Sequence, residues 1–441
     1  MSRADRGLRI VRPANFVAPA SGGLRTALIE LGAGYLAAGH DPVLVVPGTG
    51  FSDLRTPAGR VITLPDSPRI PGTGGYRALT DRPRLAALLG RLAPDRLEVS
   101  DRTTLRWTGE WARHHRVRAV MVSHESVDGV LAARGTPLPM ARAVADRLNR
   151  LTARAYSRVV CTTRRAEAEF VRIGARNVVL APLGVDLGRR RPELRDPALR
   201  ARFATPDEVL LLLCSRLSPE KHPELAPDAL ADLRARGVGA RLVVAGDGPL
   251  RGRMAERVRA DRLPVVFAGH IGEAGRPAAL QAFADIVLAP GPAETFGPAA
   301  MEALACGTPV VAHADSAVPA LMANAGVAAT GTGRAFAEGV LTLLDRPGPD
   351  RRARARRRAE RYPREAAVRA FLTAHEAAAE RIPARRRTTV GPPELPPAPS
   401  LPGIAPWLPG APVGRRSVPA VPAVPVTGIA GAADRFGEGL P

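Results

Sequence analysis

Two cations follow a strand that we predict over residues 208–215. The run EVLLLLCS is apolar almost throughout, and Arg216 and Lys221 come soon after it. Continuous apolar runs are typical of strands buried on both faces of a parallel sheet, and such sheets bind ligands beyond the carboxyl ends of their strands. An arginine that grips two oxygens and a lysine that acts as a point charge suit a diphosphate. Two cations alone are also typical of an ordinary surface loop, so the prediction of a diphosphate site needs a second motif.

That second motif is the segment PGPAETFGPAAMEALACGTPVV at residues 290–311. It follows a predicted strand at 285–290 and predicts a helix that opens near Gly297 and Pro298 and runs to about residue 307, where a glycine closes it. The backbone N–H groups of Phe296 and Gly297 then lack helical partners and are available to a phosphate.

Two glutamates accompany this predicted phosphate site. Glu294 precedes the helix and Glu302 lies within it, eight positions later. Glu294 is placed to reach hydroxyls at the reacting end of a nucleotide sugar, and Glu302 those of the ribose. Their position around a strand-to-helix phosphate site, more than their spacing, makes them candidates.

Three weaker features lie at other predicted strand ends. Gly246 belongs to a Gly-Asp-Gly turn, which resembles a nucleotide-binding turn but is more often a plain connection. Gly22 and Gly23 open a helix-like segment at 24–39, where adjacent glycines allow a ligand to approach the backbone. His124 ends a predicted strand at 118–125; a lone histidine is more often structural, but this one lies at a carboxyl edge.

The elements that must position these residues recur along most of the chain. Short apolar runs alternate with helix-like stretches, which predicts βαβ units and two doubly wound α/β domains. We expect an N-terminal domain over residues 1–190 and a nucleotide-sugar-binding domain over 200–350. A basic helical segment follows at 351–382, and a Pro-rich stretch at 383–441 predicts a disordered tail.

Composition narrows the class of protein. The 441 residues carry 63 basic and 42 acidic side chains, a net charge of +21, and only one of the 63 is lysine. The excess favours anionic partners, but aromatics at 4% argue against the stacking platforms of single-stranded nucleic-acid binders. The three cysteines predict reduced core thiols, and we expect a cytoplasmic protein because no signal peptide or membrane-spanning run is present.

The ordered set of Gly22-Gly23, His124, Arg216, Lys221 and the two glutamates resembles the retaining glycosyltransferases of family four. The resemblance covers roughly residues 8–380 and implies the GT-B fold, with two Rossmann-like domains facing across a cleft. Segments such as RLSPEKH (216–222) and TGGYRAL (73–79) are similar to actinobacterial mannosyltransferases of this family. Those enzymes imply GDP-mannose as donor, a phosphatidylinositol mannoside as acceptor and an α-1,6 linkage.

The resemblance also implies roles for single residues. Arg216 and Lys221 would neutralise the leaving diphosphate, Glu294 would hold mannose hydroxyls and Glu302 the ribose. The donor set further includes Gly23, Gly246, Phe296 and Gly297, and the acceptor set comprises Gly22, Tyr76, Arg77 and His124. The catalytic set comprises Glu294, His124, Arg216 and Lys221. We expect no obligatory cofactor and no protein-bound metal, and a Mg²⁺ ion carried by the nucleotide stays open. One departure is that the family's Gly-Gly-x-x-Glu segment reads ADSAVPA at 314–320.

A lipid-linked acceptor implies peripheral docking at the inner face of the plasma membrane, which suits the net positive charge. Residues 80–98 combine four arginines with a leucine-rich face, which predicts a core-packing amphipathic helix, with a membrane contact as the alternative. The arginines of 351–381 are likewise either a solvated helix face or a membrane contact. Two other functions stay open: a transferase with another donor or a soluble acceptor, and a non-catalytic arginine-rich membrane or nucleic-acid adaptor, for which Lys221 and Glu294 would be dispensable.

Overall fold

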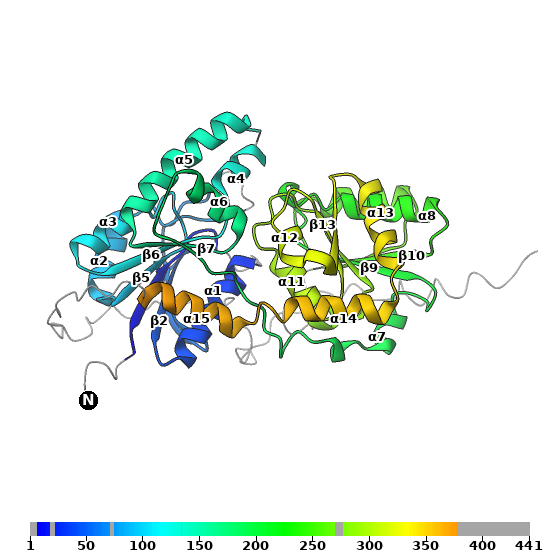
Figure 1. Cartoon of the computed structure of the whole chain (residues 1–441), viewed down its shortest axis with the longest axis horizontal. Coiled ribbons are helices and arrows are strands. Elements are labelled where there is room, and N and C mark those ends of the chain that lie inside the picture. The colour runs from blue at the N-terminus through cyan, green and yellow to red at the C-terminus, as the bar shows by residue number, and fades with distance from the viewer. Residues whose placement is uncertain (1–6, 18–22, 71–74, 134, 270–276, 377–441) are drawn as a thin grey trace, which may run out of the picture. The chain divides into compact units, whose positions relative to one another are not determined.

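The computed structural model describes residues 7–17, 23–70, 75–133, 135–269 and 277–376. Its described residues form two open sheets, each covered by helices (Figure 1). The Pro-rich tail predicted at 383–441 lies outside the described residues, as does Gly22. None of the described helices is long and apolar enough to cross a bilayer.

The first sheet has eight strands in the order β3-β4-β2-β1-β5-β6-β7-β8. All neighbours are parallel except the hairpin of β3 with β4. The strands are β1 Arg9–Pro13, β2 Asp41–Pro47, β3 Ser52–Thr56, β4 Gly59–Leu64, β5 Arg96–Val99, β6 Arg118–Ser123, β7 Arg158–Cys161 and β8 Val178–Leu180. The helices of this part are α1 Gly23–Ala37, α2 Arg82–Leu92, α3 Trp107–His114, α4 Val127–Ala133, α5 Leu138–Ala155 and α6 Arg164–Arg172.

The second sheet has six strands, all parallel, in the order β11-β10-β9-β12-β13-β14. The strands are β9 Val209–Cys214, β10 Ala240–Ala245, β11 Val265–Gly269, β12 Ile286–Ala289, β13 Val310–His313 and β14 Gly326–Ala329. The helices are α7 Pro197–Ala201, α8 Leu225–Ala235, α9 Arg251–Ala260, α10 Pro277–Phe283, α11 Pro298–Ala305, α12 Val318–Met322 and α13 Gly333–Leu344. The predicted pair of doubly wound α/β domains is confirmed.

The strand order places a topological switch point in each sheet. The chain leaves β9 toward β10 on one side and later returns to add β12 on the other, so β9 and β12 are neighbours. In the first sheet, β1 lies in the same way between β2 and β5. Doubly wound sheets open a crevice beyond the carboxyl ends of the strands at such a point. The loops after β9 and β12 are those that carry the predicted cations and Glu294.

The core explains why the apolar runs form strands. Leu210, Leu211, Leu212 and Leu213 of β9 are all fully buried, and alternate residues of the strand belong to different hydrophobic clusters on the two faces of the sheet. A strand covered on both faces needs no alternation of polar and apolar residues. The three cysteines are free thiols, as predicted, and burial raises the pKa of each to about 12.

Two sequence predictions need correction in part, and the first concerns the length of the core-packing helix predicted at residues 80–98. Helix α2 ends at Leu92, and residues 96–99 form strand β5 instead. The leucine-rich face is not available to a membrane, because Leu85, Leu88 and Leu89 are at most 6% exposed within the first domain. Core packing therefore accounts for the amphipathic pattern.

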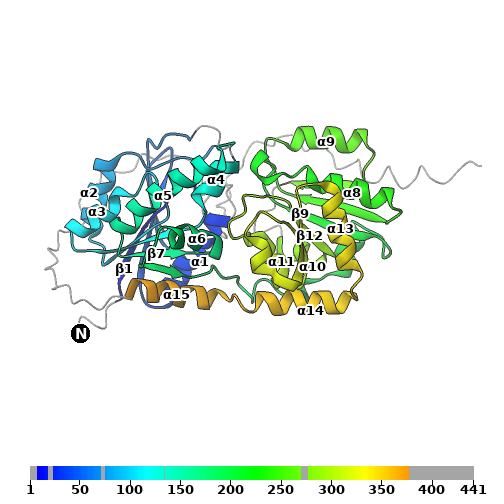
Figure 2. The same cartoon turned by 45° about the horizontal axis from the view of Figure 1, so that its top comes forward.

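The second correction concerns the arginine-rich segment 351–381. It forms two helices, α14 Gly348–Ala359 and α15 Arg364–Glu376, that are separated at Pro363. Arg352, Arg356 and Arg358 are half-buried and donate hydrogen bonds to backbone carbonyls of other elements, whereas Arg357 is exposed, so the solvated face is smaller than predicted. Helix α14 packs beside α11, while α15 packs beside α1 of the first domain (Figure 2).

A buried charge cluster fastens α15 to the first sheet. Arg12 Nε lies 2.7 Å from Glu98 Oε1, and His375 Nε2 lies 2.9 Å from Glu98 Oε2. Tyr35 also donates a 2.6 Å hydrogen bond to Glu98. Burial acts to raise the pKa of Glu98. The charge of Arg12 and the hydrogen bonds from His375 and Tyr35 outweigh burial and hold this pKa well below its usual value.

Candidate functional site

The predicted cation and the predicted glutamate of the second domain form a direct ion pair. Lys221 ends a short 3-10 turn after β9, and Glu294 follows β12; Lys221 Nζ lies 2.5 Å from Glu294 Oε1. Burial acts to lower the pKa of Lys221, but the Glu294 carboxylate outweighs it and raises that pKa. The Lys221 ammonium is therefore firmly charged. Its partner is Glu294, the carboxylate that we expect to bind sugar hydroxyls.

Arg216 is held by a carboxylate and by an aromatic ring. Its Nη2 lies 2.5 Å from Glu220 Oε1, and its Nε donates a 3.2 Å hydrogen bond to Ser218. On another side, its Cζ lies 5.1 Å from the centroid of the Tyr76 ring, a cation–π distance. Tyr76 belongs to the first domain, so this contact joins a predicted acceptor residue to a predicted phosphate-binding residue.

The start of helix α11 has the geometry of an anion site. Gly297 caps the helix in the left-handed conformation, with φ of 66°, and Pro298 occupies the first turn. A side chain at Gly297 would place its Cβ 2.4 Å from Val318, so glycine is needed for both conformation and space. Among the described residues, no acceptor pairs with the backbone N–H groups of Phe296 and Gly297, which leaves both for an anion.

Gly23 of the first domain meets this helix end. A Cβ at Gly23 would lie 2.8 Å from Cγ of Pro298, closer than an ordinary van der Waals contact. The absence of a side chain thus lets the start of α1 approach the start of α11. The two helix N-termini, each favourable for an anion, therefore meet at Gly23 and Pro298.

Glu302 faces a different set of partners. Arg190 Nη2 lies 3.2 Å from Glu302 Oε1, and the buried Gln281 donates a 3.1 Å hydrogen bond to Oε2. Burial and the charge of Glu302 raise the pKa of Glu30, on α1, to about 7. Glu302 is therefore oriented by side chains from the interdomain segment and α10, one on each carboxylate oxygen.

His124 and Arg77 occupy the first domain. His124 follows β6, and its Nε2 hydrogen-bonds Ser100 Oγ at 3.1 Å; burial lowers the pKa of His124 to about 4. The imidazole is therefore neutral at neutral pH and suits hydrogen bonding better than charge pairing. Arg77 Nη1 donates a 2.5 Å hydrogen bond to the Ser67 carbonyl, which fixes the loop that carries Tyr76.

The glycine at position 246 has a structural explanation. A Cβ there would lie 1.8 Å from the carbonyl oxygen of Ser215, so the turn after β10 packs backbone to backbone on the loop after β9. This packing supports the segment that carries Arg216. The structure brings Gly246 beside the cation loop without placing it among the charged side chains.

Several partners of the site residues were not identified from sequence. Glu220 had a usable signal, because it stands four positions after Arg216, a spacing common in ion pairs. Arg190 and Gln281 carried no signal, since both lie far from Glu302 in the chain. Contacts of this kind depend on how separate loops meet in space.

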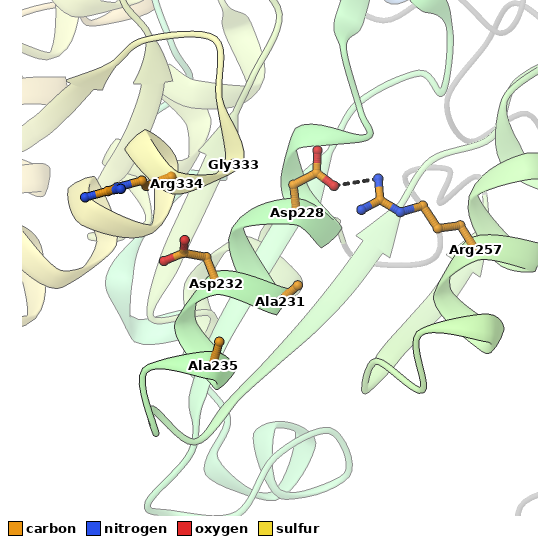
Figure 3. Close-up of a pocket in the computed structure, with 7 residues that line it drawn as sticks. All are labelled: Asp228, Ala231, Asp232, Ala235, Arg257, Gly333 and Arg334. Atoms are coloured by element: carbon orange, nitrogen blue, oxygen red, sulfur yellow. Dashed lines mark ion pairs between the residues drawn. The ribbon is translucent and has the colours of Figure 1, made fainter.

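The larger of two described hollows in the second domain lies away from these residues. A cavity of about 510 Å³ is bordered by α8, α9 and α13, and the ion pair of Asp228 with Arg257, at 2.5 Å, crosses its edge (Figure 3). Two carboxylates and two arginines line it along with small residues. None of the predicted site residues is among them.

Comparison with known families divides the chain where the two sheets divide. Residues 21–189 match the family described as Glycosyltransferase Family 4, and residues 196–362 match Glycosyl transferases group 1. A protein of Mycobacterium tuberculosis strain H37Ra is 50% identical over 356 residues, which cover 80% of this chain and 92% of that protein. It is named GDP-mannose-dependent alpha-(1-6)-phosphatidylinositol dimannoside mannosyltransferase.

More distant proteins share parts of the sequence or only the fold. A D-inositol 3-phosphate glycosyltransferase of Geodermatophilus obscurus is 32% identical over 301 residues, 63% of this chain and 64% of its own. Sucrose-phosphate synthase from Thermosynechococcus elongatus superposes with a TM-score of 0.68 at 20% identity, covering 84% of this chain and 98% of the other. Anabaena HepE in complex with UDP and glucose superposes with a TM-score of 0.65 at 19% sequence identity. The match covers 84% of this chain and 100% of the other.

Proposed function

Because this chain belongs to the family 4 and group 1 glycosyltransferases, we propose that it transfers mannose from GDP-mannose to a phosphatidylinositol mannoside. The product is a mannoside one hexose larger, α-1,6-linked, as expected for conversion of the dimannoside to the trimannoside. The donor and acceptor are those in the name of the half-identical mycobacterial protein. The observation that carries the proposal is the meeting of Lys221 with Glu294 at the switch point of the second sheet.

The geometry supports an exchange of partners when the donor binds. The diphosphate takes Lys221 from Glu294 and Arg216 from Glu220, because phosphate oxygens offer both cations stronger charge-assisted bonds. Glu294 is then released to accept hydrogen bonds from mannose hydroxyls. The amides of Phe296 and Gly297 complete the phosphate cradle, and Glu302, held by Arg190, accepts ribose hydroxyls.

Retention of the anomeric configuration follows from substitution on one face of the sugar. The bond from mannose C1 to the β-phosphate oxygen breaks while an acceptor hydroxyl oxygen bonds C1 on the same face. The leaving phosphate oxygen takes the hydroxyl proton, so no protein base is required, in keeping with the neutral His124. Lys221, Arg216 and the helix amides stabilise the charge that gathers on the diphosphate, which is where most catalytic assistance is needed.

Peripheral association with an anionic membrane is supported by helix α5. Met140 and Val144 lie one turn apart and are 55% and 42% exposed. Arg147, Arg150 and Arg154 are exposed on the same helix, and none of the three forms an ion pair with another described residue. Apolar side chains beside unpaired arginines are typical of helices that lie on anionic lipid.

A transfer assay with matched donors and acceptors tests the proposal. Purified protein is incubated with labelled GDP-mannose or UDP-glucose, and with vesicles containing phosphatidylinositol mannosides or with soluble inositol. We expect label only in the lipid fraction and only from GDP-mannose. Label from UDP-glucose would overturn the donor, and label in the soluble fraction would overturn the acceptor.

A further inference from the structure

A second cluster of arginines lies at the opposite end of the second sheet from the donor site. A cavity of about 330 Å³ opens beside Val209, where β9 begins, and beside Asp285, just before β12. Strand β9 runs from Val209 to Cys214, which separates the cavity from the Lys221 loop by roughly 17 Å at the usual rise per residue. The charged residues that line it are Arg195, Arg200, Arg351, Asp207, Glu208 and Asp285.

Two of the three carboxylates are already fully engaged. Asp285 accepts from Arg195 at 3.2 Å, from Arg200 at 2.8 Å and from a backbone N–H at 3.0 Å. Glu208 accepts two 2.9 Å hydrogen bonds from Arg241, which does not line the cavity. Both therefore lack capacity to neutralise a further guanidinium.

The arginines, in contrast, have donors left over. Arg195 Nη1, Arg200 Nε and Arg351 Nε are buried atoms without a hydrogen-bond partner among the described residues. Buried donors are almost always satisfied in folded proteins, by protein, water or ligand. Three such donors on three side chains that line one cavity therefore point to a missing acceptor.

The electrostatics agree with this geometry. Burial and the charge of Arg195 lower the pKa of Arg351, which the charge of Asp285 only partly offsets. Burial and Arg195 likewise lower the pKa of the adjacent Arg352 to about 10. Burial thus disfavours the charged form of both guanidinium groups, and a bound anion would favour it.

We propose that this cavity binds a phosphate group, as inorganic phosphate or as the phosphate of a lipid headgroup. Guanidinium groups match phosphate oxygens in geometry, and three of them converge from different elements. Arg195 belongs to the segment between the domains, Arg200 to α7 and Arg351 to α14. A phosphate there ties these elements to the start of β9, so its occupancy stabilises the second domain independently of the donor.

Calorimetric titration of the full chain tests the site with inorganic phosphate and with glycerophosphoinositol, at constant ionic strength. The variants are Arg351→Gln and Arg195→Gln, and Arg357→Gln is the matched control because it is exposed on the same helix as Arg351. We expect at least one of the two ligands to bind, and each variant to weaken that binding by tenfold or more relative to the control. Phosphate bound at the donor site is not changed by these variants, so the difference reports the cavity alone.

A variant that is expected to tighten binding separates a loss of the site from misfolding. Asp207 is exposed at the rim and repels an anion, so Asp207→Asn should tighten phosphate binding a few-fold. If phosphate alone binds, the free ion is the ligand; if the headgroup compound binds more tightly, the lipid is. Binding that Arg351→Gln, Arg195→Gln and Asp207→Asn all leave unchanged, or no binding of either compound, would overturn the proposal.

Discussion

At the scale of single residues, the site consists of ion pairs, each between a cation and a carboxylate. Lys221 with Glu294 and Arg216 with Glu220 are both 2.5 Å pairs. Residue types and strand ends were sufficient to predict three of these four residues. Glu220 was missed because a carboxylate was not expected where an anion is predicted to bind, although its Oε1 lies 2.5 Å from Arg216 Nη2.

Tyr76 offers a direct test of the cation–π contact. Tyr76→Leu keeps an apolar side chain but removes the aromatic face that Arg216 lies over. We expect about five- to thirtyfold weaker donor affinity, because a desolvated cation–π contact is worth about 1–2 kcal/mol. Titration with GDP-mannose measures it, and Tyr76→Phe, which keeps the face, serves as control. Equal affinity of Tyr76→Leu and wild type would show that the contact does not orient Arg216.

Glu30 makes stability depend on pH in a defined direction. Burial first, and the charge of Glu302 second, raise its pKa to about 7. The folded protein then keeps a proton between pH 4.5 and 7 that the unfolded chain loses, so stability falls as pH rises through this window. Glu30→Gln removes the effect, and we expect it to gain about 1–3 kcal/mol relative to wild type at pH 8 and little at pH 4. Urea unfolding at both pH values measures this; an equal difference at both would contradict it.

At the scale of elements, the continuous apolar runs were sufficient to place most strands. They failed for β3 and β14, because Ser52–Thr56 is half-exposed and polar and Gly326–Ala329 is short and rich in small residues. They also failed for β5, where the strand follows a leucine-rich helix after three residues and its pattern merges with that helix. Periodicity cannot separate two elements that share one apolar stretch.

Helix α15 was predicted as a helix, but its position was not predictable from sequence. Its anchor is Glu98, which meets His375 only because the chain returns from the second domain to the first. The pairing joins residues 277 positions apart. No local pattern in either segment indicates such a partner.

The anchor predicts a specific loss of stability. His375→Ala leaves Glu98 without one of its buried partners, and we expect a loss of about 2–4 kcal/mol in the unfolding of the first domain. Thr373→Ala, exposed on the same helix, is the control and should change stability little. Guanidinium unfolding followed by tryptophan fluorescence measures both. Similar midpoints for the two variants would show that α15 is held by its apolar contacts alone.

At the scale of the whole molecule, the excess of arginine serves several purposes. Arginines of α14 donate hydrogen bonds to backbone carbonyls of other elements of the second domain. Arginines of α5 are exposed beside apolar side chains. Net charge predicted an anionic partner but not which face meets it, because the two candidate segments proved to be structural. The exposed arginines and apolar side chains of α5 support our proposal that this helix forms that face.

Membrane association should therefore depend on α5. Val144→Asp places a negative charge among the exposed apolar and basic side chains of this helix. Val171→Asp, on α6, is the matched control because Val171 is also an exposed valine of the first domain, at 65%. We expect Val144→Asp to weaken binding to phosphatidylinositol-containing vesicles by on the order of tenfold, and binding to fall with salt. Co-sedimentation measures vesicle binding. An equal loss of binding in both variants would show that α5 is not the membrane-binding helix.

The most direct test of the central claim is the single-turnover rate of mannose transfer by Lys221→Ala. The claim is that the ammonium beside Glu294 stabilises the departing diphosphate, so we expect the rate to fall by on the order of 10²–10³-fold. Lys221→Arg should recover little of it, because a planar guanidinium cannot occupy the place of a compact ammonium. Arg253→Ala, an exposed residue of α9, should transfer mannose at the wild-type rate. Transfer by folded Lys221→Ala at that same rate would contradict the assignment of the site.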